Sequence, residues 1–160
     1  MYFVGMTRFS VYQPKSTEWH ASNESVERDA YLEYLYSDDR MSFRLHTFLE
    51  LSLPLLERAC IGFNYIHVVQ YSSEMPEKFL KILKLAEEKY TFLKLVEVNQ
   101  VDRYTQVWDV VKEFFLSYNV INEIPFGYFN LDDDDLLSID YFESAAKYIK
   151  PENIGFYVSF

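Results

Sequence analysis

Glycine is scarce in this sequence: the 160 residues include 4 glycines, against 14 tyrosines and 14 phenylalanines. Many nucleotide-binding proteins rely on glycine-rich loops that wrap backbone N–H groups around phosphate. No GxxxxGK[ST] or GxGxxG pattern occurs here, and GxSxG, HExxH and CxxC patterns are missing as well. The absence favours binding a phosphate ligand through a metal ion over binding it through backbone N–H groups.

Cysteine and long apolar runs are also lacking. The single cysteine, Cys60, excludes an internal disulfide and fits a reducing compartment, and its apolar surroundings favour a buried, inert thiol. No run approaches the ~18 apolar residues of a membrane span, and no signal-like stretch is found at the start. We therefore expect a cytoplasmic protein without a transmembrane segment, or one peripheral to the inner face of the membrane.

Positive charge is in the minority, with 15 Lys and Arg against 25 Asp and Glu and a formal net charge of −10. Nucleic-acid binding requires basic patches, so this class of partner is excluded. The same acidic excess would repel a phosphate ester unless a divalent cation or a few arginines offset it. Hydrophobic residues make up 49% of the chain, which predicts one folded domain over residues 1–160 with a sizeable core.

Strand-like and helix-like segments alternate along the chain. Short runs rich in β-branched and aromatic residues predict strands at 2–12, 64–72, 92–98, 127–131 and 154–160. Apolar residues at helical spacing predict helices at 42–60, 76–90, 105–118 with Thr105 as N-cap, and 139–149. This order predicts an α/β fold with a mainly parallel sheet and helices on both faces.

Three features depart from a plain alternation. Residues 13–40 are predicted to be an insertion with a short helix at 26–36. Pro54 interrupts the first long helix, which either kinks there or gives way to a second helical segment. The apolar final segment has no covering structure after it, so we expect the chain to be truncated after the fifth strand.

Four consecutive aspartates, Asp132 to Asp135, follow the fourth predicted strand. Parallel α/β sheets bind their ligands beyond the carboxyl ends of the strands, so the cluster lies where a ligand is expected. One interpretation is a solvated loop, in which Asp135 interacts with the dipole of a helix beginning near Ser138. The other is a site for Mg²⁺ or Mn²⁺, which prefer oxygen ligands, because Asp132 and Asp134 point the same way in a strand-end turn.

The segment YFNLDDDDLLSIDYFE resembles the Asp-x-Asp region of nucleotide-sugar glycosyltransferases with the GT-A fold. Together with TRFSVY, FRLHTFLELSLPLLE and VVQYSSEMP, it resembles a bacterial rhamnosyltransferase family over most of the chain except residues 13–40. The resemblance implies a GT-A-like, Rossmann-related α/β fold. It also implies transfer of a sugar from a nucleotide-diphosphate donor to a glycan or saccharide acceptor, with Mn²⁺ or Mg²⁺ as cofactor.

The resemblance further implies roles for individual residues. Asp134 would be the main metal ligand, and Asp132 would face the ribose of the nucleotide or support the metal through water. Asp133 is assigned to nucleotide-sugar binding, and Asp135 to the metal as a helix-side carboxylate. The grip on the nucleotide is expected from residues at the ends of the first two strands, namely Thr7, Arg8, Phe9 and Ser72.

The remaining candidate site residues are arginines and histidines. Arg8, Arg44 and Arg103 are placed for phosphate, since Arg offers bidentate donors and Arg103 precedes a predicted helix; a surface ion pair is the alternative for each. The histidines, which are His20, His46 and His67, are expected to be structural. No catalytic base and no oligomeric state can be predicted from these residues.

Two other functions use similar features. A haloacid-dehalogenase-type phosphatase also carries Asp-x-Asp after an apolar strand, but its motif normally continues with Thr or Val and lies near the N-terminus. A non-catalytic acidic α/β module that binds Ca²⁺ or a partner protein would also explain the cluster. Turnover of an aryl phosphate would distinguish the phosphatase, and metal-dependent binding of nucleotide diphosphates would distinguish the transferase.

Overall fold

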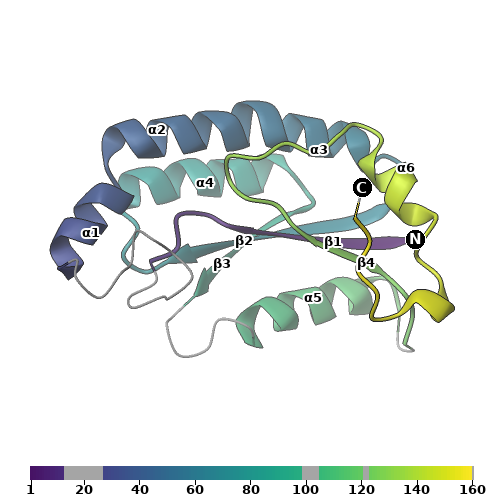
Figure 1. Cartoon of the computed structure of the whole chain (residues 1–160). Helices are drawn as coiled ribbons and strands as arrows, with labels where there is room; N and C mark the ends of the chain where they lie inside the picture. The colour runs from purple at the N-terminus through teal and green to yellow at the C-terminus, as the bar shows by residue number, and fades with distance from the viewer. Residues whose placement is uncertain (13–26, 99–104, 121–122, 160) are drawn as a thin grey trace.

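The computed structural model describes residues 1–12, 27–98, 105–120 and 123–159 (Figure 1). Its sheet has four parallel strands in the order β3-β2-β1-β4. The strands are β1 (Tyr2–Arg8), β2 (Asn64–Ser72), β3 (Leu93–Val98) and β4 (Gly127–Asn130). Parallel neighbours require long crossover connections, which the intervening helices supply.

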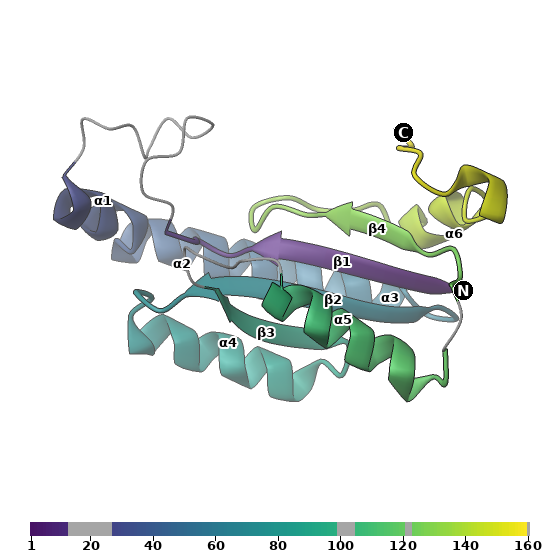
Figure 2. The same cartoon turned by 90° about the horizontal axis from the view of Figure 1, so that it is seen from below.

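Helices cover both faces of the sheet. One face carries the continuous run of α2 (Asp38–His46), the π-helical η2 (Thr47–Ser52) and α3 (Leu53–Ala59), with α4 (Glu77–Lys89) beside it. The opposite face carries α5 (Thr105–Ser117), which Figure 2 shows in front of the sheet. The short elements lie toward the ends of the sheet and are α1 (Arg28–Leu35), α6 (Tyr141–Ala146) and the 3-10 turn η3 (Pro151–Asn153).

Strand β1 is central and is buried on both faces. Because side chains alternate along a strand, Phe3 and Phe9 enter the larger core under α2, α3 and α4, whereas Val4 and Met6 enter the smaller core under α5. This is the GT-A-like, Rossmann-related α/β architecture expected from the sequence. Within the described ranges, no helix combines the length and apolar character that crossing a membrane requires.

The first long helix begins at Asp38 and changes its hydrogen-bond pattern just before Pro54. A proline inside a helix has no N–H to donate and clashes with the carbonyl four residues earlier. Here the π-helical η2 precedes it, and Pro54 falls in the first turn of α3, where a missing N–H is tolerated. The helical run therefore continues through the proline, and π-helical turns of this kind are frequent at functional sites.

Two expectations are corrected by the structure. Residues 154–159 form no strand: Gly155 adopts φ +86° and Phe156 N–H bonds back to the Asn153 carbonyl, so the segment turns outside the sheet. The helix after the aspartates begins only at Tyr141, with Asp140 as N-cap. Asp135 is therefore not in its first turn, and the helix-dipole interpretation of this carboxylate is wrong. The short helix expected inside the insertion is confirmed as α1, while residues 13–26 lie outside the described residues.

Candidate functional site

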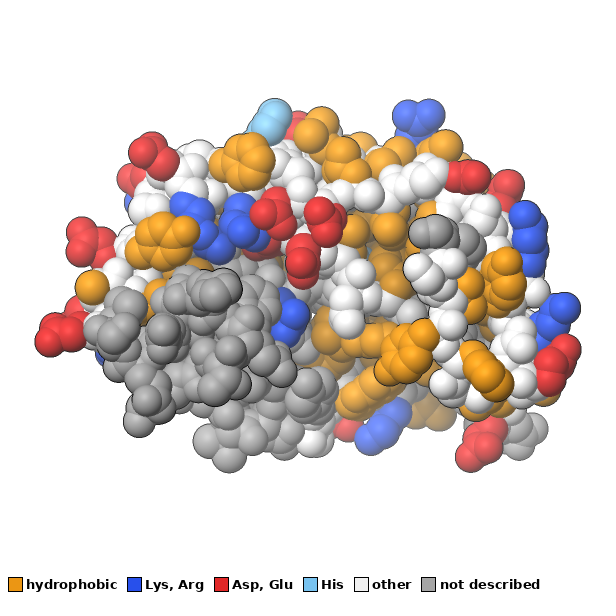
Figure 3. Space-filling view, viewed as in Figure 1, with side chains coloured by type: hydrophobic (Ala, Val, Ile, Leu, Met, Phe, Trp, Pro, Cys, Tyr) orange, Lys and Arg blue, Asp and Glu red, His pale blue; other side chains and the backbone are white. Residues whose placement is uncertain are grey.

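The four aspartates, Asp132 to Asp135, form a tight turn directly beyond β4, which we call the acid turn. Pairing with β1 extends one residue past the strand, since Leu131 N–H donates to the Met6 carbonyl at 2.9 Å. The turn is closed by Asp135 N–H, which donates to the Asp132 carbonyl at 3.1 Å. Figure 3 shows acidic side chains gathered beside Lys or Arg side chains on this face of the molecule. The turn thus lies at the carboxyl edge of the sheet, where parallel α/β folds bind ligands.

Asp133 points into the protein and is 1% exposed. Its Oδ1 pairs with Nη1 of Arg44 on α2, and its Oδ2 accepts the Ser10 N–H at 3.2 Å. The second guanidinium nitrogen of Arg44 lies 3.1 Å from Oδ2 of Asp134. A buried carboxylate is tolerated only when it is paired and hydrogen-bonded, and these contacts supply both. Asp133 therefore anchors the acid turn, and one arginine bridges two adjacent carboxylates.

Ser10 has the backbone conformation that allows this anchoring. It follows β1 with φ +47°, a left-handed conformation that costs a non-glycine residue about 1 kcal/mol. Its Oγ accepts Nη1–H of Arg40 at 2.8 Å, and its carbonyl accepts the Tyr36 hydroxyl at 3.1 Å. Burial raises the pKa of Tyr36 to about 12, so this hydroxyl keeps its proton and remains a donor. Tyr36, directly after α1, and Arg40 of α2 thus hold Ser10, just beyond β1, beside the acid turn.

The backbone of the acid turn is fixed from the other side. The Thr7 hydroxyl donates to the Leu131 carbonyl at 2.7 Å, and the Ser52 hydroxyl of η2 donates to the Asp135 carbonyl at 2.8 Å. With Asp133 anchored inside, the carboxylates of Asp132 and Asp135 are exposed, and the Asp134 side chain is 40% exposed. The π-helical turn therefore contributes directly to the position of the acid turn.

The positive side of the site comes from two arginines one helical turn apart on α2. Burial lowers the pKa of the Arg44 guanidinium and the nearby charge of Arg40 lowers it further, whereas Asp134 and Asp132 act in the opposite direction. An arginine stays protonated despite such shifts, so Arg44 keeps its positive charge. Residues four apart lie on the same helix face, and from it Arg44 contacts the acid turn directly, whereas Arg40 binds Ser10, which in turn contacts Asp133.

Beneath the acid turn, the buried side chain of His67 is hydrogen-bonded to Thr7 and Tyr65 in an aromatic core. His67 has no exposed surface; its Nε2 is 2.8 Å from Thr7 Oγ1 and its Nδ1 is 2.5 Å from the Tyr65 hydroxyl. Burial lowers the pKa of His67 to about 3, so the ring is neutral at physiological pH. The expectation of a structural role for His67 agrees with this environment. His46 is exposed on α2, and His20 lies outside the described residues.

Of the residues expected to bind the nucleotide, some are buried and one is exposed in the structure. Thr7 and Phe9, which were expected to contact the nucleotide, are both fully buried at the carboxyl edge of the sheet. Ser72, at the end of β2, is 3% exposed, and its Oγ accepts the Tyr12 N–H at 2.6 Å. Arg8 is exposed at the end of β1, and Arg103 lies outside the described residues.

Several residues that build the site carry no recognisable motif. They are Ser10, Tyr36, Arg40, Ser52 and Tyr65, and no pattern in the sequence predicted a functional role for any of them. Arg40 falls in the predicted insertion, outside the helix predicted at 42–60, so its i, i+4 relation to Arg44 is seen only in α2, which begins at Asp38. The left-handed conformation of Ser10 and the π-helical turn at Ser52 are set by tertiary contacts, which local patterns do not encode.

The acid turn can be tested for its fit to a divalent metal ion. Across the described ranges, no group of three or more His, Cys, Asp or Glu side chains could hold a metal. Asp132, Asp134 and Asp135 nevertheless offer hard oxygen donors, and Mg²⁺ commonly takes one or two carboxylates and completes its shell with water and phosphate. Arg44 competes for Asp134. The acid turn therefore offers exposed carboxylate oxygens to a metal ion but no complete set of protein ligands, so phosphate and water would have to complete the shell.

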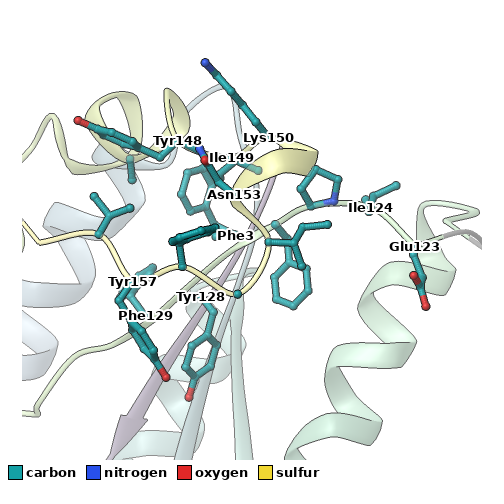
Figure 4. Close-up of a pocket in the computed structure, with 18 of the residues that line it drawn as sticks. Phe3, Glu123, Ile124, Tyr128, Phe129, Tyr148, Ile149, Lys150, Asn153 and Tyr157 are labelled. Atoms are coloured by element: carbon teal, nitrogen blue, oxygen red, sulfur yellow. The ribbon is translucent and has the colours of Figure 1, made fainter.

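A separate cavity of about 1260 Å³ lies beside the edge strand β4. It is lined by residues of α5, of β4 and of the segment 148–158, and Figure 4 shows Phe3, Tyr128, Phe129 and Tyr157 among its aromatic side chains. No residue of the acid turn lines it. The cavity is therefore distinct from the charged site at the carboxyl edge.

Comparison with known proteins identifies a family match that includes the acid turn. The chain matches the family described as "Putative rhamnosyl transferase" over residues 2–151. No curated protein and no solved structure matches it. The matched span includes all the strands of the sheet, the arginine pair of α2 and the acid turn.

Proposed function

Because the chain belongs to the rhamnosyl transferase family, a family of glycosyltransferases, we propose that it transfers a sugar from a nucleotide-diphosphate donor to a glycan or saccharide acceptor. The observation that carries this proposal is the acid turn at the carboxyl end of β4, with Arg44 against it. Ligands of parallel α/β sheets bind at this edge, and a donor diphosphate needs positive charge there. Although the chain has a net charge of −10, Arg40 and Arg44 of α2 supply positive charge near this edge.

The proposal includes Mg²⁺ or Mn²⁺ at the exposed carboxylates of the acid turn. Asp134 and Asp132 would hold the ion, with Asp135 as a further oxygen donor. When bound, such an ion supplies Lewis-acid stabilisation of the charge on the departing nucleotide diphosphate. Asp133 is assigned the role of an anchor, because its carboxylate is already paired with Arg44 and Ser10.

The remaining protein groups would bind and orient the donor. Arg44 and Arg40 offer fork-shaped guanidinium donors, which suit the bidentate recognition of phosphate oxygens. Arg8, exposed at the end of β1, lies at the same edge of the sheet, and Arg103 is proposed as an additional phosphate ligand. In the reaction, the oxygen of an acceptor hydroxyl group forms a bond to the anomeric carbon, and the hydroxyl proton is released to solvent. The bond from that carbon to the diphosphate oxygen breaks, and the nucleotide diphosphate leaves with the electron pair.

Titration calorimetry with Mn²⁺ and a panel of nucleoside diphosphates tests the proposal. We expect binding of at least one diphosphate that strengthens on addition of Mn²⁺ and is lost in Asp134→Asn. The absence of metal-dependent binding by folded wild-type protein would contradict it. Turnover of an aryl phosphate, measured on the same samples, would instead favour a phosphatase.

A further inference from the structure

Three buried polar side chains link the strands under the acid turn. Tyr65 and His67 belong to β2, Thr7 belongs to β1, and the carbonyl that Thr7 binds belongs to Leu131, just beyond β4. Thr7 and His67 are 0% exposed and Tyr65 is 6% exposed. The rings of Phe48, Tyr65 and Phe129 surround His67 at centroid distances of 6.0, 5.9 and 6.3 Å. Polar groups in such a core are costly unless every one is hydrogen-bonded.

The protons of this group have a single consistent arrangement. The Leu131 carbonyl can only accept, so Thr7 donates its one hydroxyl proton there. Thr7 Oγ1 must then accept from His67, which places the ring proton on Nε2. Because the ring is neutral, Nδ1 carries no proton and accepts the Tyr65 hydroxyl. Among the described residues, no buried side-chain nitrogen or oxygen is left without a partner.

Gly5 makes room for this arrangement. It pairs with His67 on one side and with Phe129 on the other, in the middle of β1. A Cβ at this position would lie 2.5 Å from His67 Nδ1 and 2.7 Å from the Tyr65 hydroxyl oxygen. Glycine inside a strand weakens it and commonly marks a close approach of other atoms. Here the approaching atoms are the two that form the Tyr65–His67 hydrogen bond.

From this geometry we propose that Tyr65, His67 and Thr7 form a directional hydrogen-bond relay that positions the acid turn, with His67 as a positioning residue for donor binding. The Leu131 carbonyl shares its rigid peptide plane with Asp132 N–H, so a shift of this carbonyl tilts the first aspartate of the turn. The proposed relay runs Tyr65 O–H to Nδ1, Nε2–H to Thr7 Oγ1, and Thr7 O–H to the carbonyl. Its consequence for donor binding rests on the function proposed above.

The relay is tested first without any ligand, by NMR of the full chain. The ¹⁵N shifts of the His67 ring should report a neutral ring with the proton on Nε2. Thr7→Val, which removes the hydroxyl at nearly constant volume, should shift the Asp132 amide and the His67 ring signals. Thr7→Ser, which restores the hydroxyl, should return both toward wild type. A proton on Nδ1, or an unmoved Asp132 amide in Thr7→Val, would overturn the proposal.

Two glycine variants distinguish an effect on the relay from a general effect of crowding in the core. Gly5→Ala pushes against His67 and Tyr65, whereas a Cβ on Gly127 would meet the apolar Phe3 ring at 2.6 Å. Both substitutions should lower the melting temperature, but only Gly5→Ala should move the His67 ring signals and the Asp132 amide. Equal effects of the two variants on these signals would overturn the relay. Should Thr7→Val not fold, Tyr65→Phe removes the other end of the relay and must move the same signals.

Binding measurements with a nucleoside diphosphate then test whether the relay affects the proposed donor site. Thr7→Val should weaken Mn²⁺-dependent binding of a nucleoside diphosphate by about tenfold, the scale of one lost hydrogen bond, and Thr7→Ser should restore most of it. Unchanged affinity in folded Thr7→Val would contradict the positioning role. A wild-type protein that binds no diphosphate would instead contradict the proposed function, while the ligand-free NMR result would still decide the relay.

Discussion

Asp133 and Asp134 are adjacent in the chain but have opposite environments, with side chains 2% and 40% exposed, and Arg44 contacts both. The two carboxylates therefore have different tasks. Asp133 is held inside by Arg44 and Ser10 and fixes the turn, while Asp134 is partly exposed to solvent and pairs with the second guanidinium nitrogen of Arg44. This difference separates the structural aspartate, Asp133, from Asp134, which we propose as a metal ligand, within a run of identical residues.

The first prediction is that isosteric changes at these two positions have contrasting effects. Asp133→Asn removes one charge of a buried ion pair, so we expect the free energy of unfolding to fall by about 3 kcal/mol. Asp134→Asn removes a half-exposed charge and should leave stability nearly unchanged while abolishing Mn²⁺-dependent diphosphate binding. Urea unfolding and calorimetry of both variants provide the measurements. A stability loss at Asp134 larger than that at Asp133 would contradict the assignment.

The second prediction concerns the bridge made by Arg44. Arg44→Lys keeps the positive charge but cannot offer a planar fork to both carboxylates. We expect Mn²⁺ alone to bind more tightly, because Asp134 is released, and a nucleoside diphosphate to bind at least about tenfold more weakly, because a bidentate donor is lost. The control is Arg28→Lys, at an exposed arginine whose side chain contacts Asp29 and Glu74. Weaker Mn²⁺ binding in Arg44→Lys would show that the arginine supports the metal ligands and does not compete with the ion.

The third prediction is a pH dependence of stability from His67. Burial lowers the pKa of His67 from an ordinary value of 6.5 to about 3 in the folded protein. Between these two values the unfolded chain binds a proton at His67 and the folded protein does not. Stability is therefore intact above pH 6.5 and falls as the pH drops below it, by up to about 1.4 kcal/mol per pH unit. Urea unfolding between about pH 7 and pH 5 measures the slope.

The control for this slope is His67→Gln, which lacks the titrating group and should show a flatter dependence over the same interval. The interval ends at about pH 5 because carboxylates contribute increasingly below it. A slope that is identical in wild type and in His67→Gln would contradict the buried neutral state of this histidine.

Much of the fold could be predicted from the sequence because it depends on local periodicity. The alternation of strands and helices, the parallel sheet and the position of the aspartates at a strand end all follow from side-chain spacing. The predicted strand at 154–160 failed for a physical reason. An apolar run forms a strand only with a neighbour to pair with, and here a turn at Gly155 takes the segment away from the sheet.

The position of the four aspartates at the end of a strand could be predicted from the sequence, but the different environments of the individual aspartates could not. Local pattern does not determine which of four identical aspartates points inward, because Arg44 and Ser10 decide this from distant parts of the chain. Similarly, Thr7, in β1, and Phe9, just beyond it, are near a predicted ligand edge, but both side chains are fully buried. Such contacts exist only after the chain has folded.

The most direct test of the central claim is paramagnetic broadening by Mn²⁺ in the presence of a nucleoside diphosphate. We expect the loss of amide signals to centre on residues 132–135 and to extend to Ser10 at the end of β1, with little effect on α5. In Asp134→Asn this broadening should disappear. Broadening centred on another part of the molecule, or unchanged in Asp134→Asn, would contradict the assignment of the donor site to the acid turn.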